Sequence, residues 1–344
     1  MADLSEIAVA EKQRQEECRQ GDDGYCLENT FHAARMINIY THPLFYKHDT
    51  GIGHPENASR LDAAFEGVVR AGLSDRVVRQ TAEHPDTDRI IAKVHSADYE
   101  RELDEACRMG MRLFHSLDNP ISSQSFAAAR AAVGTALTAA AGVLEGEPAF
   151  VAARPPGHHA ERLEAMGFCF FNTIACVAEW MLEQPGMARL LVFDFDVHHG
   201  NGTQSLFEDR EDLFYVSMHR YPFYPGTGAL SEIGIGMGRG FTKNIPMEAG
   251  LGDAAYMRAT EDVVMRIIDS YRPSAILLSA GFDAHARDPL GGMRVTERCF
   301  GEMTRRVVEA AERDSAGRVL SLLEGGYDME GLAASVAEHV NAMA

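Results

Sequence analysis

Short apolar runs that alternate with longer helical patterns constrain the fold of this 344-residue chain more than any other feature. Each run is a few residues long and is bounded by polar residues or glycine, as is typical of buried strands in a parallel sheet. The runs are 149–153, 190–195, 213–218, 275–280 and 319–323. Helical spacing of apolar residues covers 59–71, 123–145, 171–183, 254–271 and 296–313. The alternation predicts an α/β fold, a single-domain open parallel sheet with helices on both faces.

The pattern along the chain changes near residue 36. Residues 1–35 are polar and carry few large apolar side chains, whereas Met36 begins an apolar, strand-like run. We therefore expect residues 1–35 to be an N-terminal extension and residues 36–344 to be one folded domain.

Polar residues whose side chains can bind a metal or take part in catalysis follow each of the five apolar runs. In order along the chain they are RPPGHHA (154–160), DVHHGNGT (196–203), His219, GFDAH (281–285) and EGGY (324–327). Ligands of open α/β sheets bind outside the carboxyl ends of the strands. The five strand ends therefore predict one shared cleft.

Three of these residues form a candidate metal site. Asp196 and His198 are two residues apart at a strand end, so their side chains point to the same side, and Asp283 from another strand end would complete the set. One histidine and two carboxylates leave a coordination position open, which is typical of a catalytic metal. The same donors accept Zn²⁺, Fe²⁺ or other divalent ions. The alternative is that these acids cap loops, as a single Asp at a strand end usually does.

Hydrolysis at such a metal needs a base, an acid and a donor for the developing oxyanion. His158 and His159 are adjacent in a stiff Pro-Pro-Gly loop, and Asp194 is free to orient a histidine from behind the metal. The Tyr327 phenol follows a Gly-Gly pair and is a candidate oxyanion donor. The alternative for Tyr327 is a loop tyrosine that covers the core.

The motifs together resemble the histone deacetylase superfamily, which includes acetylpolyamine amidohydrolases and has the arginase-like α/β fold. The motifs that carry the resemblance are RPPGHHA, GFCFFN (167–172), DFDVHHGNGT (194–203), PGTG (225–228), GFDAHARDPLGG (281–292) and EGGY. They occur in family order over about residues 38–340, and HHGNGT and DPLGG are closer to class II enzymes and their bacterial relatives. The resemblance implies that residues 36–344 are a catalytic domain of the deacetylase type.

The resemblance implies a role for each matching residue. Asp196, His198 and Asp283 match the zinc ligands, and His159 matches the general base. The other matches are His158 as the electrostatic histidine with Asp194 as its partner, Asn201 as the class II partner of His159, Tyr327 as the catalytic tyrosine, and Arg60 near an inner acetate channel. A structural K⁺ site would match Asp194, Asp196, His198, Ser217 and Met218, largely through backbone oxygens.

The walls of an acyl-lysine tunnel would match Gly167, Phe168 and Tyr224, with a tyrosine in place of the more usual phenylalanine at 224. Leu290 occupies the position where polyamine-selective relatives carry a glutamate, which favours acyl-lysine in proteins or peptides over acylated polyamines as the substrate. Asp118 is a candidate to hold the substrate backbone at the rim of the tunnel; the alternative is that it lies in a solvated turn.

Two alternative functions remain for the protein. One is an arginase-like ureohydrolase with two manganese ions, and the other is a catalytically inactive acyl-lysine-binding protein.

Composition limits the partners of the chain. The net charge of −19 would repel phosphate backbones, so we expect no direct nucleic-acid binding, although an acidic surface can attract cationic substrates. The six cysteines show no CxxC or zinc-finger spacing and are interpreted as free thiols. We find no apolar run that approaches a membrane span of about 18 residues and no signal-peptide core. These patterns predict a cytoplasmic protein without a membrane partner, and they leave self-association as a homo-oligomer open.

Overall fold

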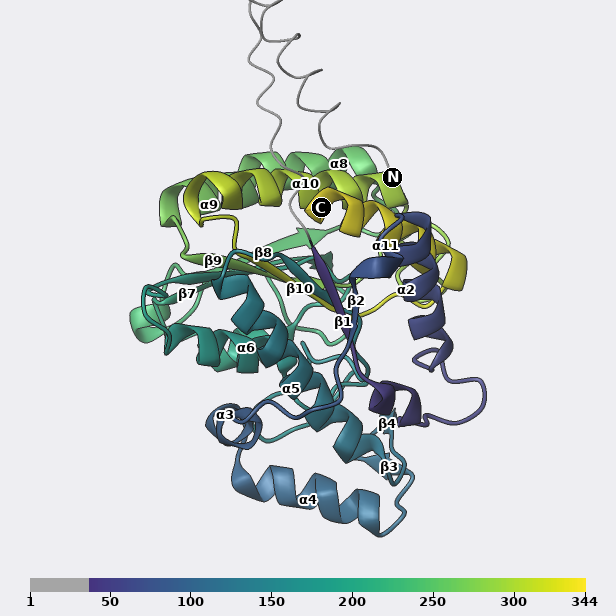
Figure 1. Ribbon diagram of the computed structural model, residues 1–344. Coiled ribbons are helices and arrows are strands. Elements are labelled where there is room, and N and C mark those ends of the chain that lie inside the picture. Colours follow the sequence, from purple (N-terminus) through teal and green to yellow (C-terminus); the bar gives the residue numbers. More distant parts are fainter. Residues whose placement is uncertain (1–36) are drawn as a thin grey trace, which may run out of the picture. The chain divides into compact units, whose positions relative to one another are not determined.

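A parallel sheet forms the centre of the protein in the computed structural model, which describes residues 37–344 (Figure 1). Within these residues the sheet has eight strands in the order β2-β1-β5-β10-β9-β6-β7-β8, and every neighbouring pair is parallel. The strands are β1 (Asn38–Thr41), β2 (Val77–Arg79), β5 (Ala149–Val151), β6 (Leu190–Asp194), β7 (Leu213–Arg220), β8 (Thr242–Met247), β9 (Ala275–Ala280) and β10 (Val319–Leu323). The predicted extension, 1–35, lies outside the described residues, so its boundary stays a prediction.

Helices cover both faces of the sheet, as the sequence predicts. One face carries α8 (Asp253–Ala259), α9 (Met265–Tyr271), α10 (Glu297–Asp314) and α11 (Met329–Met343), and α2 (Ser59–Arg70) packs against α11 (Figure 1). The other face carries α5 (Ser125–Leu144) and α6 (Thr173–Leu182), with α3 (Thr87–Val94) and α4 (Ala97–Arg108) packed outside them. The structure also has α7 (Asn201–Phe207) and a small antiparallel hairpin of β3 (Leu113–Phe114) and β4 (Ser116–Pro120). A π-helical turn, Thr260–Val264, joins α8 to α9 into the one helical stretch that the sequence predicts.

All five predicted strands and all five predicted helices are present, with shifts of a few residues at their ends. One expectation is wrong in detail: β7 continues to Arg220, so Met218 and His219 lie inside the strand rather than at and beyond its end. The edge strand β8 has the sequence TKNIPM, and β2 is only three residues long. Neither has the continuous apolar run of a strand that is covered on both faces, and the sequence does not reveal them.

Helix α5 corrects the expectation about apolar segments. It has 20 residues and a mean hydropathy of 1.4 over its most apolar window, enough in length and composition to cross a membrane. Most of its side chains are buried, and it packs against β5, β1 and α6. Its apolar character is therefore explained by its position inside the fold.

His339 joins three elements of the core. Its ring lies in α11, where Nδ1 pairs with the Thr304 hydroxyl of α10 at 2.7 Å and Nε2 pairs with the Ser321 hydroxyl of β10 at 2.8 Å. The side chain is fully buried, and this burial lowers the pKa of His339 to about 3. The folded protein therefore keeps this ring neutral at pH values where the unfolded chain protonates it.

We predict that His339 weakens the fold as the pH falls below about 6.5. Because the unfolded state binds one more proton between that pH and about 3, the free energy of unfolding falls with falling pH, by about 2 kcal/mol from this group between pH 6.5 and 5. Urea unfolding at both pH values should give a loss that is smaller by this amount in His339→Gln than in the unaltered protein. Equal losses in the two proteins would contradict the assignment.

Candidate active site

The predicted substrate and catalytic residues meet in one narrow pocket. It has a volume of about 190 Å³ and is lined by Asp118, His159, Gly167, Phe168, His198, Tyr224, Leu290 and Tyr327. These residues come from the β4 hairpin strand and from the loops after β5, β6, β7, β9 and β10. The structure therefore brings together all five residues predicted for substrate binding and three of those predicted for metal binding or catalysis.

The three predicted metal ligands lie beside one another. One donor atom from each of Asp196, His198 and Asp283 lies within 4.8 Å of the other two. The His198 Nδ1 atom is 3.1 Å from Asp196 Oδ1 and 3.0 Å from Asp283 Oδ2. Both carboxylates are at most 1% exposed. One nitrogen and two carboxylate oxygens converge at a buried point, which is a donor set suited to a catalytic divalent cation.

Electrostatics at this point favour a cation. Burial and the neighbouring Asp196 raise the pKa of Asp283 to about 7. The histidines have the opposite effect on Asp196: despite its burial, His158 and His198 lower the pKa of that carboxyl. Two buried carboxylates this close cannot both remain ionised without a compensating positive charge.

Backbone groups fix the two carboxylates from behind. The Gly325 amide donates to Asp196 Oδ2, and the Val197 amide donates to Asp283 Oδ1, both at 2.8 Å. A Cβ atom on Gly325 would overlap the oxygens of both acids. The first glycine of EGGY is therefore required because the backbone passes directly against the two acids that are predicted metal ligands.

The two adjacent histidines have different partners. His158 Nδ1 pairs with Asp194 Oδ2 at 3.1 Å, and His159 Nδ1 pairs with Asn201 Oδ1 at 2.8 Å. Although burial opposes the charged form, Asp194 and Asp196 raise the pKa of His158 to about 10. Burial and the neighbouring His158 charge hold the pKa of His159 well below its ordinary value. At neutral pH one ring is therefore a cation and its neighbour is a neutral base.

Tyr327 is held at the pocket by two contacts. Its backbone amide donates to Asp288 Oδ2 at 2.6 Å, and the Arg60 guanidinium lies 4.9 Å from the centre of its ring. Arg60 Nε also donates to the Gly326 carbonyl at 2.7 Å, and Arg60 reaches the Glu324 carbonyl as well. Burial raises the pKa of Tyr327 well above its ordinary value, so its phenol stays a hydrogen-bond donor.

The pocket wall at Gly167 and Phe168 has an unusual backbone. Both residues have positive φ, +56° and +69°, and a Cβ on Gly167 would overlap the His159 ring. The hairpin holds this turn, because Gly167 N donates to Asp118 Oδ2 at 3.1 Å and Phe168 N donates to Asn119 Oδ1 at 2.8 Å. The Tyr224 hydroxyl donates to the same Asp118 oxygen at 3.0 Å. Asp118 therefore ties both walls of the pocket together.

The predicted K⁺ site shares Asp196 and His198 with the predicted metal ligands, and its other residues lie on the neighbouring strands β6 and β7. Asp194 and Ser217 are register partners on β6 and β7, and Asp194, Ser217 and Met218 are fully buried. The Asp194 carboxylate already accepts hydrogen bonds from the Asp196 amide and the Tyr215 hydroxyl. The ion itself stays a prediction.

The sequence analysis did not single out three buried charged residues around this site, which are Glu56, Arg154 and Glu324. Glu324 Oε2 accepts hydrogen bonds from the Gly157 and His158 amides at 2.7 and 3.2 Å, and so shapes the histidine loop. Glu56 forms an ion pair with both Arg60 and Arg154. Each lies in a motif of the sequence: Glu56 in HPENASR (54–60), Arg154 in RPPGHHA and Glu324 in EGGY. A charged residue inside such a motif could therefore have indicated a buried role near the site.

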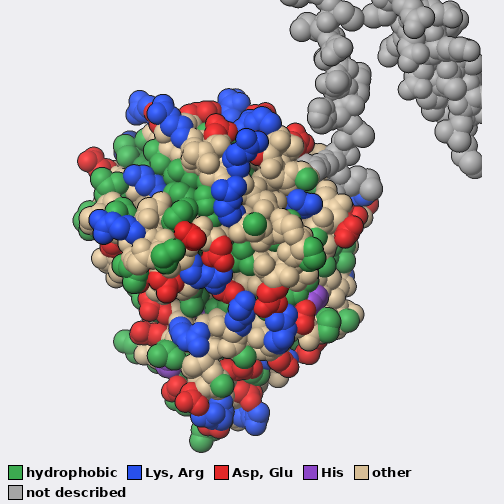
Figure 2. Space-filling view, turned by 90° about the vertical axis from the view of Figure 1, so that its left-hand side faces the viewer, with side chains coloured by type: hydrophobic (Ala, Val, Ile, Leu, Met, Phe, Trp, Pro, Cys, Tyr) green, Lys and Arg blue, Asp and Glu red, His purple; other side chains and the backbone are tan. Residues whose placement is uncertain are grey.

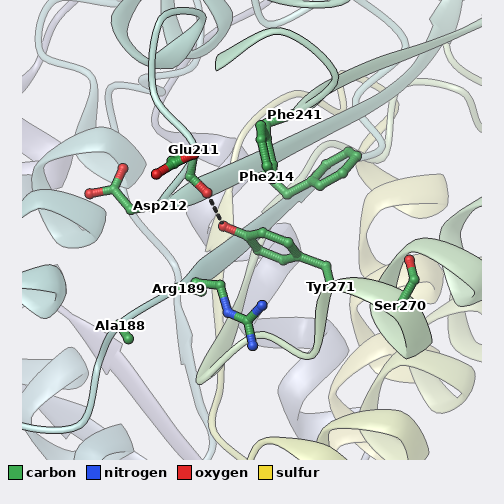
Figure 3. A pocket seen from close by; sticks show the side chains of 8 residues that line it. All are labelled: Ala188, Arg189, Glu211, Asp212, Phe214, Phe241, Ser270 and Tyr271. Carbon is green, nitrogen blue, oxygen red and sulfur yellow. Dashed lines mark hydrogen bonds between the residues drawn. The ribbon is translucent and has the colours of Figure 1, made fainter. Parts of the chain in front are cut away.

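A larger hollow, of about 530 Å³, lies near the opposite ends of β6, β7 and β8 (Figure 3). Figure 3 shows Tyr271 with Phe214 and Phe241 on one side and Arg189 on the other; the Arg189 guanidinium is 5.3 Å from the centre of the Tyr271 ring. The three aromatic rings contact one another, with centroids 5.3–5.9 Å apart. Arg189 thus covers one face of the largely buried Tyr271 ring, and among the described residues no metal donor set lies in this hollow.

The chain belongs to the histone deacetylase family. Residues 54–343 match the model of the histone deacetylase domain. A probable deacetylase of Archaeoglobus fulgidus is 36% identical over 300 residues, which cover 86% of this chain and 82% of that protein. The histone deacetylase-like amidohydrolase of Pseudomonas aeruginosa is 38% identical over 276 residues, covering 79% and 71%.

The fold comparison agrees with the sequence matches. The crystal structure of the HDA15 HD domain is similar, with a TM-score of 0.84, 32% identity, and coverage of 90% of this chain and 89% of that one. Family membership implies a hydrolase of the deacetylase and amidohydrolase type, a metal ion and acetylated substrates. The face in Figure 2 carries both Lys and Arg and Asp and Glu side chains.

Replacing Asp283 should abolish metal binding. Asp283→Ala removes one of three convergent donors, so we expect the metal content to fall far below one ion per chain, as measured by elemental mass spectrometry after dialysis against zinc. Asp75→Ala is the control, because the Asp75 side chain is 75% exposed and pairs only weakly with Arg76. Full metal occupancy in Asp283→Ala would refute the ligand set.

Proposed function

We propose that this protein is a zinc-dependent deacetylase that hydrolyses the side-chain amide of N6-acetyl-lysine in peptides or proteins. The observation that carries the proposal is the convergence of Asp196, His198 and Asp283 with His159 and Tyr327 on one narrow pocket. An acyl-lysine side chain is long, thin and mostly apolar. The largely hydrophobic pocket walls suit its methylene stem, and the polar groups gather where its amide would lie.

A divalent metal held by these three residues would polarise the amide carbonyl and lower the pKa of water from 15.7 to about 7. The buried pair of carboxylates supports this assignment, because His198, 3.1 Å from Asp196 and 3.0 Å from Asp283, offers at most one positive charge to two acids. Zn²⁺ is the proposed ion, and the oxygen-rich donor set also suits Fe²⁺.

His159 is the proposed general base. With its Nδ1 proton donated to Asn201, the Nε2 lone pair is available to take a proton from the attacking water. The same ring then delivers a proton to the leaving amine, a step for which a positioned acid–base group contributes about 10²–10⁴ in rate. A neutral asparagine partner, rather than a carboxylate, keeps His159 from becoming strongly basic.

His158 and Tyr327 are proposed to stabilise negative charge as it develops on the carbonyl oxygen. His158 is paired with Asp194 and carries a positive charge beside the reacting centre. Tyr327 is a neutral phenol on a loop that Arg60 and Asp288 hold in place. A donor fixed before the reaction stabilises the oxyanion without a cost of reorganisation.

The apolar Leu290 supports acyl-lysine over acylated polyamines as the substrate. Leu290 lines the pocket and offers no charge to a second ammonium group. An acylpolyamine is the second candidate substrate, favoured by the net charge of −19. A ureohydrolase with two manganese ions would need a second full metal set beside the first. A non-catalytic acyl-lysine-binding protein would bind the peptide without turnover.

Removing the Tyr327 phenol should reduce turnover without loss of metal. We expect Tyr327→Phe to lower kcat on a fluorogenic acetyl-lysine peptide by about 10²–10³, because the hydroxyl acts on the transition state. Zinc content should stay at one ion per chain. Tyr46→Phe is the control, since the Tyr46 hydroxyl donates to Asp62 at the surface. Unchanged turnover in Tyr327→Phe would remove the oxyanion role from the proposal.

A substrate panel separates the candidate functions. The unaltered protein should show a larger kcat/KM for an acetyl-lysine peptide than for N-acetylputrescine. Leu290→Glu should shift this ratio toward the polyamine by about tenfold, or about 1.4 kcal/mol, because the new carboxylate would pair with the free ammonium. A much larger kcat/KM of the unaltered protein for the polyamine would overturn the peptide assignment, and no turnover of any acylated amine would overturn the deacetylase function.

A further inference from the structure

The amide of Asn201 has a third partner besides His159 and the backbone. Its Nδ2 atom donates to Glu161 Oε1 at 2.7 Å, with weaker contacts to the His159 carbonyl at 3.4 Å and Met166 Sδ at 3.2 Å. Asn201 is 5% exposed, so it has little access to water as an alternative partner. Glu161 thus provides the only charged acceptor that the described residues offer to this amide.

The orientation of the Asn201 amide decides which nitrogen of His159 carries the proton. With Oδ1 toward His159, Nδ1 must donate, and Nε2 keeps the lone pair that a base needs. If the amide rotated by 180°, its NH₂ group would face His159 Nδ1, and the ring proton would move to Nε2. The ring would then be unable to accept a proton at Nε2.

A carboxylate on the far side of the amide makes the rotated state unfavourable. A carboxylate is an acceptor only, so the rotated amide would bring its own oxygen against Glu161 Oε1. Two acceptors would then face each other in a partly buried place, which costs the hydrogen bond and adds repulsion. An uncharged amide at position 161 would lack this preference, because it can donate as well as accept.

The backbone of Glu161 is held at both of its polar groups. Its amide donates to the Glu164 carbonyl at 2.9 Å, and its carbonyl pairs with His95 Nδ1 at 3.0 Å. The side chain lines a surface hollow of about 480 Å³ together with Glu164, Glu208 and Asp209. The backbone of Glu161 is therefore held in place, and its side chain contacts Asn201 and does not line the candidate substrate pocket.

We propose that Glu161 is a positioning residue of the proposed reaction: it holds the Asn201 amide with its oxygen toward His159 and so fixes the tautomer of the general base. The inference rests on the proposed function for its kinetic consequences. The selection of one His159 tautomer by Glu161 through Asn201 does not depend on catalytic activity.

The first test compares three variants with the unaltered protein on the acetyl-lysine peptide. We expect Glu161→Ala and Glu161→Gln to lower kcat by about 10- to 100-fold with little change in KM, which is less than the 10²–10⁴ that the general base itself contributes. Glu164→Ala is the matched control, because this neighbouring exposed acid lines the same hollow without contacting Asn201. Equal kcat in the Glu161 variants and the control would overturn the proposal.

The second test exchanges the amide and the carboxylate between positions 201 and 161. Asn201→Asp alone places two carboxylates against each other and should lower kcat. Combined with Glu161→Gln, the new carboxylate accepts from His159 Nδ1 in either orientation, and the new amide donates to its other oxygen. The double variant should show a higher kcat than either single variant, although the carboxylate beside His159 raises the basicity of that ring. A double variant that is no faster than the single variants would overturn the proposal.

The third test reads the tautomer directly and does not need activity. Long-range ¹H–¹⁵N spectra of metal-free protein labelled with ¹⁵N-histidine, assigned with His159→Gln, should show the proton of His159 on Nδ1. In Glu161→Ala part of the population should carry it on Nε2. If the unaltered protein proves inactive, this spectrum still decides the positioning role. An unchanged tautomer in Glu161→Ala would overturn it.

Discussion

Two buried carboxylates that face each other, Asp196 and Asp283, impose the constraint on which the rest of the site depends. Removing a charge from water costs several kcal/mol per ion even after the protein relaxes, and two like charges add their repulsion. Positive charge and backbone donors compensate the two carboxylates. His198 lies between the acids, and the amides of Val197 and Gly325 donate hydrogen bonds to them. The same arrangement explains why the pocket walls are apolar, since water in this place would weaken every one of these interactions.

The parts of the fold that were predictable are those in which local pattern and burial agree. The central strands β5, β6, β9 and β10 are covered on both faces and therefore read as continuous apolar runs. The metal and histidine motifs follow these strands directly, so their meeting point followed from the fold class. The edge strand β8 was missed because one of its sides lacks a neighbouring strand and its residues are mixed.

Contacts between segments far apart in the sequence were not predictable. Asp118 lies in LDNP, which is typical of a turn, yet here it belongs to β4 and joins the two walls through Gly167 and Tyr224. Similarly, the contact of Glu161 with Asn201 links residues 40 positions apart, and no local pattern marks it. These contacts depend on the exact approach of loops that the sheet has already positioned, which periodicity does not describe.

The strand order has a consequence for how the chain acquires its structure. β10 is the last strand along the described residues, yet it lies in the middle of the sheet between β5 and β9. During synthesis, β1, β2 and β5 on one side, and β6 to β9 on the other, have no direct pairing with each other until β10 inserts between them. The nascent chain would thus expose two apolar strand edges, a state prone to aggregation and suited to chaperone binding. Only Glu324 separates β10 from the Gly-Gly-Tyr segment. The candidate active site is therefore complete only after β10 has joined the two halves of the sheet, and a chain that ends before β10 would lack Tyr327.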